Sequence, residues 1–209
     1  MDTQKFSGPM TARIVDMISN GELLRAQRVR EVEISKKLGV SRIPLREAMK
    51  QLASQGVLEA RERGGMNVKA FTATQIDEIR SVRAALEPIA FRQAAPHLQD
   101  QEHRIALNAI LEEMKWACKT RDQSAVAAAD IAFHSFLIAL SGNDLIRNIW
   151  HGLEFQLRII FRLELCVPTN LDEVVPKHKR LRDVLLNNYL DGLEALVADH
   201  VRPELSVSG

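Results

Sequence analysis

The sequence predicts a mainly α-helical protein of two domains, in which a small domain of short helices and one hairpin precedes a helical bundle. Six of the ten glycines precede residue 66, which indicates short elements and frequent turns there. After residue 71 the apolar residues recur with a helical period almost to the end. The charge balance changes at the same place. Residues 1–71 carry 13 Lys and Arg against 8 Asp and Glu, whereas residues 72–209 carry 15 against 19.

The composition is that of an ordinary soluble chain, with 46% hydrophobic and 26% charged residues among 209. It excludes a disordered, collagenous or coiled-coil protein. No uncharged run is long enough to span a membrane and no apolar signal core begins the chain, so we expect a cytoplasmic protein with no membrane partner. Cys118 and Cys166 have no metal or redox spacing, and we expect two reduced thiols.

The first domain, residues 1–71, is expected to contain three helices and a β-hairpin. The helices are predicted over residues 11–19, 32–38 and 42–55. Gly39 ends the second, Ser41 is the expected N-cap of the third, and Gly56 its expected C-cap. Two apolar strands flank residues 62–65 and predict the hairpin. This order of elements is that of a winged helix-turn-helix domain.

The third helix carries a basic stripe formed by Arg42, Arg46 and Lys50, which are spaced by four residues. The stripe lies about 110° from the apolar face at 100° per residue, so the helix can pack on one side and enter a major groove beside it. Further basic and polar residues suit phosphates or the wing, namely Lys36, Lys37, Ser41, Arg61, Arg63 and Lys69. Such a stripe can also be no more than the solvent-exposed face of a surface helix. The turn spacing, the basic hairpin and the charge asymmetry together favour DNA binding.

The second domain, residues 72–209, is expected to be a bundle of about six helices. They are predicted over residues 74–95, 101–119, 122–141, 144–165, 171–188 and 190–202. The expected caps are Thr74, Asp100, Asn143 and Asn170, and the expected breaks are Pro96, Gly142 and Pro168.

Three histidines and one aspartate of the bundle share faces with its core residues. Asp130 and His134 are one helical turn apart, while His178 and His200 each lie on the leucine-rich face of a later helix. One inward histidine alone is more often a hydrogen-bonded core residue. Four such groups together predict a divalent metal site, which Zn²⁺, Ni²⁺, Mn²⁺ or Fe²⁺ could occupy. The remaining histidines, His97, His103 and His151, are expected to face solvent.

The run from Leu38 to Phe71 resembles the DNA-binding domain of GntR-family bacterial transcription regulators. The matching motif is Leu-Gly-Val-Ser-Arg, then Pro, an aliphatic residue and Arg-Glu-Ala. The resemblance implies that Arg42 and Arg46 read bases, that Ser41 holds the DNA backbone, and that Gly65 lets the wing approach the minor groove. Ile43 stands where Thr is usual and removes one hydroxyl from the DNA face. Upstream, residues 22–27 replace the family's Pro-Gly turn.

The order Asp130, His134, the Ser-Gly-Asn of residues 141–143, His178 and His200 is similar to the FCD ligand domain of the FadR subfamily. This resemblance implies a divalent metal at which a small carboxylate is sensed. Arg83 and Glu87 resemble an Arg and a Glu of the family's first bundle helix, where the arginine can meet an effector carboxylate. Arg162 is a second candidate, because an arginine fork would bind an acid beside the metal. Either arginine could instead form an ordinary ion pair.

The expected function is that of a metabolite-responsive transcription regulator, most simply a repressor, and not of an enzyme. A homodimer would place two recognition helices on a pseudo-palindromic operator in double-stranded DNA. Two alternatives use the same four side chains. One is a metal-dependent enzyme that acts on a small carboxylate, although no general acid or base is evident beside the cluster. The other is a structural metal that only stabilises the bundle.

Overall fold

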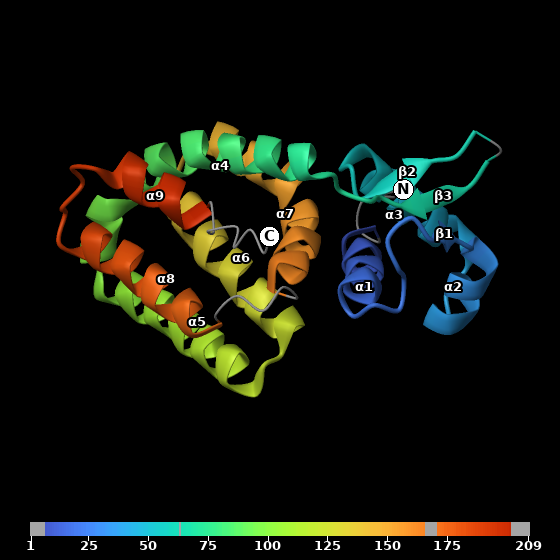
Figure 1. The fold of residues 1–209 in the computed structure, drawn as a ribbon, viewed down its shortest axis with the longest axis horizontal. Helices are drawn as coiled ribbons and strands as arrows, with labels where there is room; N and C mark the ends of the chain where they lie inside the picture. Colours follow the sequence, from blue (N-terminus) through green and yellow to red (C-terminus); the bar gives the residue numbers. More distant parts are fainter. Residues whose placement is uncertain (1–6, 63, 166–170, 202–209) are drawn as a thin grey trace, which may run out of the picture. The chain divides into compact units, whose positions relative to one another are not determined.

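The computed structural model describes residues 7–62, 64–165 and 171–201, and the side chains of residues 10–62, 64–160 and 171–201 within them (Figure 1). The chain forms two compact units. One comprises residues 1–71 with 155–159, and the other comprises residues 72–154 with 160–209. The division at residue 72 coincides with the change in charge along the sequence.

Within residues 7–62 and 64–71, the first unit contains three helices and a small antiparallel sheet, to which residues 155–159 of the later helix α7 (Asp144–Leu165) are added (Figure 1). The sheet has the order β1-β3-β2, with Arg28 opposite Asn67 and Leu58 opposite Val68. Strand β1 was not expected, because two residues are too few to give a recognisable alternation. It adds a third strand to the predicted hairpin. The elements are α1 (Ser7–Ser19), β1 (Arg28–Val29), α2 (Glu31–Leu38), α3 (Arg42–Ser54), β2 (Leu58–Ala60) and β3 (Met66–Val68).

Helices α2 and α3 meet through a turn set by glycine. Gly39 has φ +65° and is the left-handed C-cap of α2, a conformation that a Cβ atom disfavours. Ser41 stands at the predicted N-cap position of α3. The C-cap of α3 is Gln55 and not Gly56, which follows it with φ +70°. The apolar faces of α2 and α3 are buried as predicted at Ile34, Leu45, Ala48, Met49 and Leu52, whereas Leu38 and Val40 are only half-buried.

The second unit is a helical bundle in which α6 packs against both α4 and α5, α9 packs on α4, and α8 packs on α5 (Figure 1). Phe91 and Phe133 are among its fully buried side chains. Its elements are α4 (Ala73–Ala94), the 3-10 helix η2 (Ala95–Gln99), α5 (Gln101–Thr120), α6 (Gln123–Leu140), α7 (Asp144–Leu165), α8 (Leu171–Leu186) and α9 (Leu193–Val201).

The caps of the bundle helices agree with the sequence in two cases and differ in one. The side chains of Asp100 and Asn143 accept backbone N–H groups at the starts of α5 and α7. Helix α4 begins one residue earlier than predicted, and its cap is Thr72 and not Thr74. Thr72 forms a reciprocal capping box with Gln75. The predicted cap Asn170 and break Pro168 lie outside the described residues.

Helix α6 is the one helix among the described residues that is long and apolar enough to cross a membrane by length and composition. The buried core helix of a soluble protein meets the same criterion. Helix α6 packs against two other helices of the bundle, and it carries the ionisable residues Asp130 and His134. We therefore assign it as the core helix of the bundle.

Candidate functional site

The basic stripe predicted on the third helix lies on the exposed face of α3. Arg42, Arg46 and Lys50 are all exposed there, and the side chain of Ile43 is 78% exposed beside them. Ser41 is exposed at the start of the helix, and its hydroxyl makes no capping hydrogen bond to the described residues. The side chain of Ser41 is therefore available to an external partner.

A carboxylate of the preceding helix holds two arginines of this stripe. Glu31, the first residue of α2, accepts hydrogen bonds from Arg46 Nε at 3.2 Å and from Arg46 Nη2 at 2.9 Å. Arg42 Nη2 donates to the same carboxylate at 3.3 Å. The hydrogen bond from Arg46 is the main reason that the pKa of Glu31 lies below its usual range. Sequence reasoning missed Glu31, because no local spacing connects it with residues 11 and 15 positions later.

The hairpin between β2 and β3 places glycine at its tip. Gly65 has φ +88°, and a Cβ atom there would lie 3.7 Å from Nε of Arg28. The backbone N–H of Arg61 donates to the carbonyl of Gly65 at 3.1 Å and closes the turn. The tip is exposed and has basic side chains beside it at Arg28 and Arg61. The predicted wing residue Arg63 lies outside the described residues.

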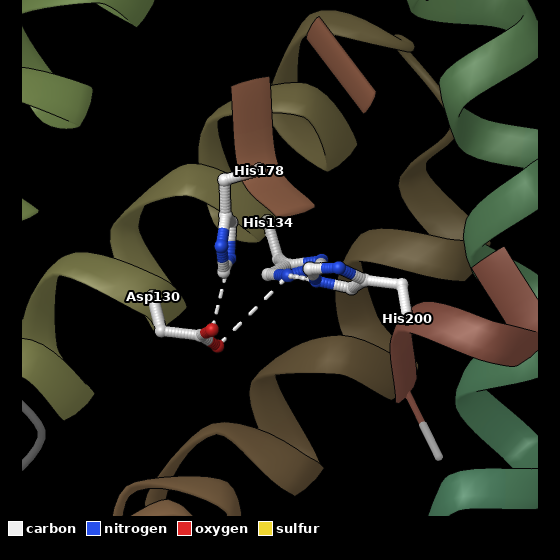
Figure 2. Close-up of side chains that lie close together, drawn as sticks. All are labelled: Asp130, His134, His178 and His200. Carbon is white, nitrogen blue, oxygen red and sulfur yellow. Dashed lines mark hydrogen bonds and ion pairs between the residues drawn. The ribbon is translucent and has the colours of Figure 1, made fainter. Parts of the chain in front are cut away.

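The four predicted metal ligands converge within the bundle. Figure 2 shows Asp130 and His134 from α6, His178 from α8 and His200 from α9 pointing toward one another. One ligand atom from each residue lies within 4.8 Å of the other three. The side chains of His134 and His178 are buried, and that of Asp130 is 14% exposed.

The positions of the ring protons make this cluster a suitable cation site. His178 Nδ1 donates to the carbonyl of Val174 at 2.7 Å, so Nε2 of the neutral ring carries a lone pair. That lone pair faces Oδ1 of Asp130, 2.9 Å away. Two lone pairs at this distance repel unless a cation lies between them or the ring gains a second proton. Nε2 of His134 and Nε2 of His200 lie 3.1 Å apart, within hydrogen-bond distance if one of the two rings carries its proton there.

The donor set and the donor spacings fit a transition metal. Three imidazole nitrogens and one carboxylate oxygen are typical ligands of Zn²⁺ and of its divalent neighbours in the first transition row. Adjacent ligands at about 2.1 Å from one ion lie about 3.0–3.4 Å apart. The observed spacing of 3.1 Å lies within that range, the spacing of 2.9 Å lies just below it, and Nε2 of His134 is 3.9 Å from Oδ2 of Asp130. Oδ2 of Asp130 and Nδ1 of His200 are buried and have no hydrogen-bond partner among the described residues.

A second carboxylate, that of Glu87, lies next to the cluster. The sequence singled out Glu87 only through its resemblance to the FCD family. Glu87 of α4 is fully buried, with Oε2 2.9 Å from Nδ1 of His134 and Oε1 2.5 Å from Nε of Arg83. A proton on Nδ1 of His134 lets Glu87 accept it and leaves Nε2 directed at the cluster. The Arg83 guanidinium lies 5.6 Å from the ring of Trp150.

The charges of the site follow from burial and from these contacts. Burial alone would raise the pKa of the Glu87 carboxyl, but Arg83 and His134 outweigh it and hold the pKa below its usual range. Burial would also raise the pKa of Asp130, but the contacts with His178 and His134 outweigh it and lower the pKa. Burial lowers the pKa of His200 well below its usual value. Asp130 is therefore ionised and His200 neutral, which are the forms that bind metals.

The remaining predicted positions are found in different environments. Arg83 is 3% exposed and forms an ion pair with Glu87, which is the alternative that the sequence left open for this arginine. Through Glu87, which contacts His134, Arg83 also lies next to the cluster. Arg162 belongs to α7, but its side chain lies outside the described residues. His97 and His151 are exposed as predicted. The expectation for His103 was wrong in part, because it is half-buried, with Nδ1 2.8 Å from the carbonyl of His97.

Comparison with known proteins assigns both units. Residues 10–68 match the family model of bacterial regulatory proteins of the gntR family, and residues 78–203 match that of the FCD domain. A "Probable D-xylose utilization operon transcriptional repressor" of Paenarthrobacter nicotinovorans is 32% identical over 173 residues, which are 82% of this chain and 75% of that one. The gluconate operon transcriptional repressor of Bacillus subtilis is 34% identical over 68% of this chain and 56% of its own.

A solved structure shows the same fold at low identity. Escherichia coli McbR/YncC superposes with a TM-score of 0.79 at 20% identity over 94% of this chain and 93% of that one. The family matches and the named relatives are transcription regulators, so the enzyme alternative finds no support among them. The chain belongs to the GntR family of DNA-binding bacterial transcription regulators, with an FCD domain following its helix-turn-helix domain.

Proposed function

We propose that this regulator is a cytoplasmic homodimeric repressor that senses a small carboxylate at a divalent metal bound by Asp130, His134, His178 and His200. The convergence of these four donors within 4.8 Å is the observation that carries the proposal. Repression is favoured because the D-xylose and gluconate relatives are named operon repressors.

The proposed DNA contacts come from the exposed end of α3 and from the tip of the wing. Arg42, Arg46 and Lys50 present cationic groups on a helix whose neighbouring apolar face is buried, which suits a major groove. The exposed methyl groups of Ile43 suit a thymine methyl group rather than a phosphate. Ser41 would contact the DNA backbone, and Gly65 would allow the wing to approach the minor groove.

A second copy of the chain would bring two such helices to one operator. Val82 and Ile89 lie two turns apart on one face of α4 and are 41% and 49% exposed. Exposed apolar residues on one helical face favour burial against another protein. We therefore place the dimer contact on this face, and Ile89→Glu should shift the sedimenting species toward a monomer.

The environment of the donors favours an anion beside the metal. When bound, the metal would act as a Lewis acid that accepts an oxygen ligand at any position that the four side chains leave open. Burial alone would raise the pKa of Asp130, but His178, His134 and the buried cation Arg83 outweigh that effect and lower it. The positive charge of Arg83 favours a carboxylate, and Arg162 remains a second candidate for that contact.

Selection of the metal-loaded protein on random double-stranded DNA tests the DNA half of the proposal. We expect a short inverted repeat to be enriched, and Arg46→Ala should abolish the enrichment. Uniformly weak binding that falls steeply with salt would show instead that the basic face seeks phosphates without reading sequence.

The sensing half is tested by binding and melting measurements on the same protein. We expect metal to raise the melting temperature of the bundle, and small carboxylates to raise it further and to change the affinity for the selected operator. If metal stabilises the bundle but no small acid changes its melting temperature or its DNA affinity, the metal is structural and the sensing proposal is wrong.

A further inference from the structure

We infer that Glu31 is a positioning residue for DNA reading, whose carboxylate holds one edge of the Arg46 guanidinium so that the opposite edge faces a guanine. The inference rests on the proposed base contact by Arg46. It adds a specificity-determining residue from a different helix, one that does not itself touch a base.

The contact between Glu31 and Arg46 uses only one edge of the guanidinium. Nε donates to Oε1 at 3.2 Å and Nη2 donates to Oε2 at 2.9 Å, which is a side-on fork. A guanidinium has five N–H groups in one plane. The side-on fork engages the Nε–H and one Nη2–H, so Nη1 and the second Nη2–H form an end-on edge on the other side. That edge matches the O6 and N7 acceptors of guanine in the major groove.

The position of Glu31 makes it a firm support for this arginine. It is the first residue of α2, where the positive end of the helix dipole favours a carboxylate, and its side chain is only 23% exposed. The Arg46 side chain is 52% exposed, so without a partner it would sample many rotamers in solution. Holding it in one orientation before DNA arrives reduces the conformational entropy lost on binding.

The same carboxylate also brings a second cation into line. Nη2 of Arg42 donates to Oε2 of Glu31 at 3.3 Å, and this is the oxygen that also accepts from Nη2 of Arg46. Two guanidinium groups repel each other, and a shared carboxylate between them offsets that repulsion. Glu31 therefore fixes the spacing of the two arginines that face the major groove in the proposed complex.

A simple neutralising role makes the opposite prediction about affinity. If Glu31 only competed with DNA for the arginines, its removal would strengthen binding to every sequence, because a negative charge near phosphates would be lost. A positioning role predicts instead a loss of discrimination at one base pair. The two roles are therefore distinguished by whether the affinity changes for every sequence or the discrimination falls at one base pair of the operator.

The test compares Glu31→Gln with Glu33→Gln in the full-length, metal-loaded protein. Glu33 is a matched control, because it is an exposed acid of the same helix that pairs with Arg30 at 2.9 Å. Binding is measured to the selected operator, to operators changed at each single base pair, and to random DNA. The base pair read by Arg46 is the one at which Arg46→Lys, which lacks the fork, loses discrimination.

We expect Glu31→Gln to lower discrimination at that base pair by about tenfold and to leave the other positions unchanged. Affinity for random DNA should stay equal or rise, and Glu33→Gln should keep the full discrimination. In the Arg46→Lys background, Glu31→Gln should have no further effect at that position, because the residue acts through Arg46.

Two results would overturn the inference. One is that Glu31→Gln keeps the discrimination at the Arg46 position or strengthens operator and random DNA alike. The other is that it weakens all positions equally, which a local folding defect would also do. If Arg46→Ala leaves sequence-specific binding intact, the proposed function has lost its base contact, and the role of Glu31 fails with it. If Arg46→Ala abolishes that binding and Glu31→Gln does not reduce discrimination, only the role of Glu31 fails.

Discussion

Replacing Glu87 by glutamine should destabilise the helical bundle even when no metal is present. The carboxylate is fully buried between Arg83 and His134, and the Arg83 guanidinium is itself 3% exposed. Removing one partner of a buried ion pair leaves the other charge uncompensated, at a cost of about 3–5 kcal/mol. Glutamine keeps the shape and one acceptor oxygen, so we expect a loss near the lower end, about 3 kcal/mol of unfolding free energy.

That loss corresponds to a fall in melting temperature of about 10 °C, at about 3–4 °C per kcal/mol for a unit of this size. The assay is tryptophan fluorescence in the presence of a chelator. Both tryptophans of the chain, Trp116 and Trp150, belong to the bundle, so the signal reports on this unit alone. A chelator separates the ion-pair effect from any effect on metal binding.

Glu78→Gln is the matched control, because Glu78 is an exposed acid of the same helix α4. It should melt within about 1 °C of the parent, as is typical of surface substitutions. With metal added, Glu87→Gln should also bind the ion about 10–100-fold more weakly, since Glu87 orients His134. A melting temperature within about 2 °C of the parent under chelation would refute the ion-pair reasoning, whatever the metal affinity.

Three further predictions concern the cluster, the core of the first unit and the acid that holds the arginines. His178→Ala should abolish the rise in melting temperature that Zn²⁺ produces, which calorimetry with and without a chelator would measure. A rise that persists in this variant would contradict the prediction. Leu45→Ala, at a fully buried site, should cost the first unit about 2–5 kcal/mol and leave the tryptophan transition in place, which paired circular dichroism and fluorescence melts would show. The pKa of Glu31 is lowered chiefly by the hydrogen bond from Arg46, so this carboxylate stabilises the fold above its ordinary pKa and loses that effect as pH falls through its lowered value. Carbon-13 NMR should give Glu31 a lower midpoint than in Arg46→Ala, and equal midpoints would contradict the contact.

The helices could be predicted from the sequence because their burial is periodic. Helices α4 to α9 were expected within a few residues of their observed bounds, since each has an apolar face. Strand β1 could not be found, because its pairing with β3 depends on a chain reversal and not on its own two residues. The start of α4 was missed although its signal was present. Thr72 has Gln three positions later and forms the capping box, whereas Thr74 lacks that partner.

The cluster of proposed metal ligands was predictable for a different reason, namely the cost of burying polar groups. An aspartate or histidine on an apolar face needs a partner, and four such residues on three helices could satisfy one another only by meeting. The structure brings Asp130, His134, His178 and His200 together as this reasoning requires. The pairing of Arg83 with Glu87 was also within reach, since the two residues are one helical turn apart on α4.

The contacts that two carboxylates make with side chains of other helices have no such signal, and both contacts serve the same physical role. Glu31 on α2 holds Arg46 on α3, and Glu87 on α4 holds His134 on α6. In each case the acid lies on one helix and the side chain that it orients lies on another, so no period within a single element connects them. An arginine or histidine that must present one edge to a partner needs its other edge fixed, and a carboxylate does this with a directed hydrogen bond. The residues proposed to contact DNA or metal were therefore accessible to sequence patterns, whereas those that orient them required the packing of one helix against another.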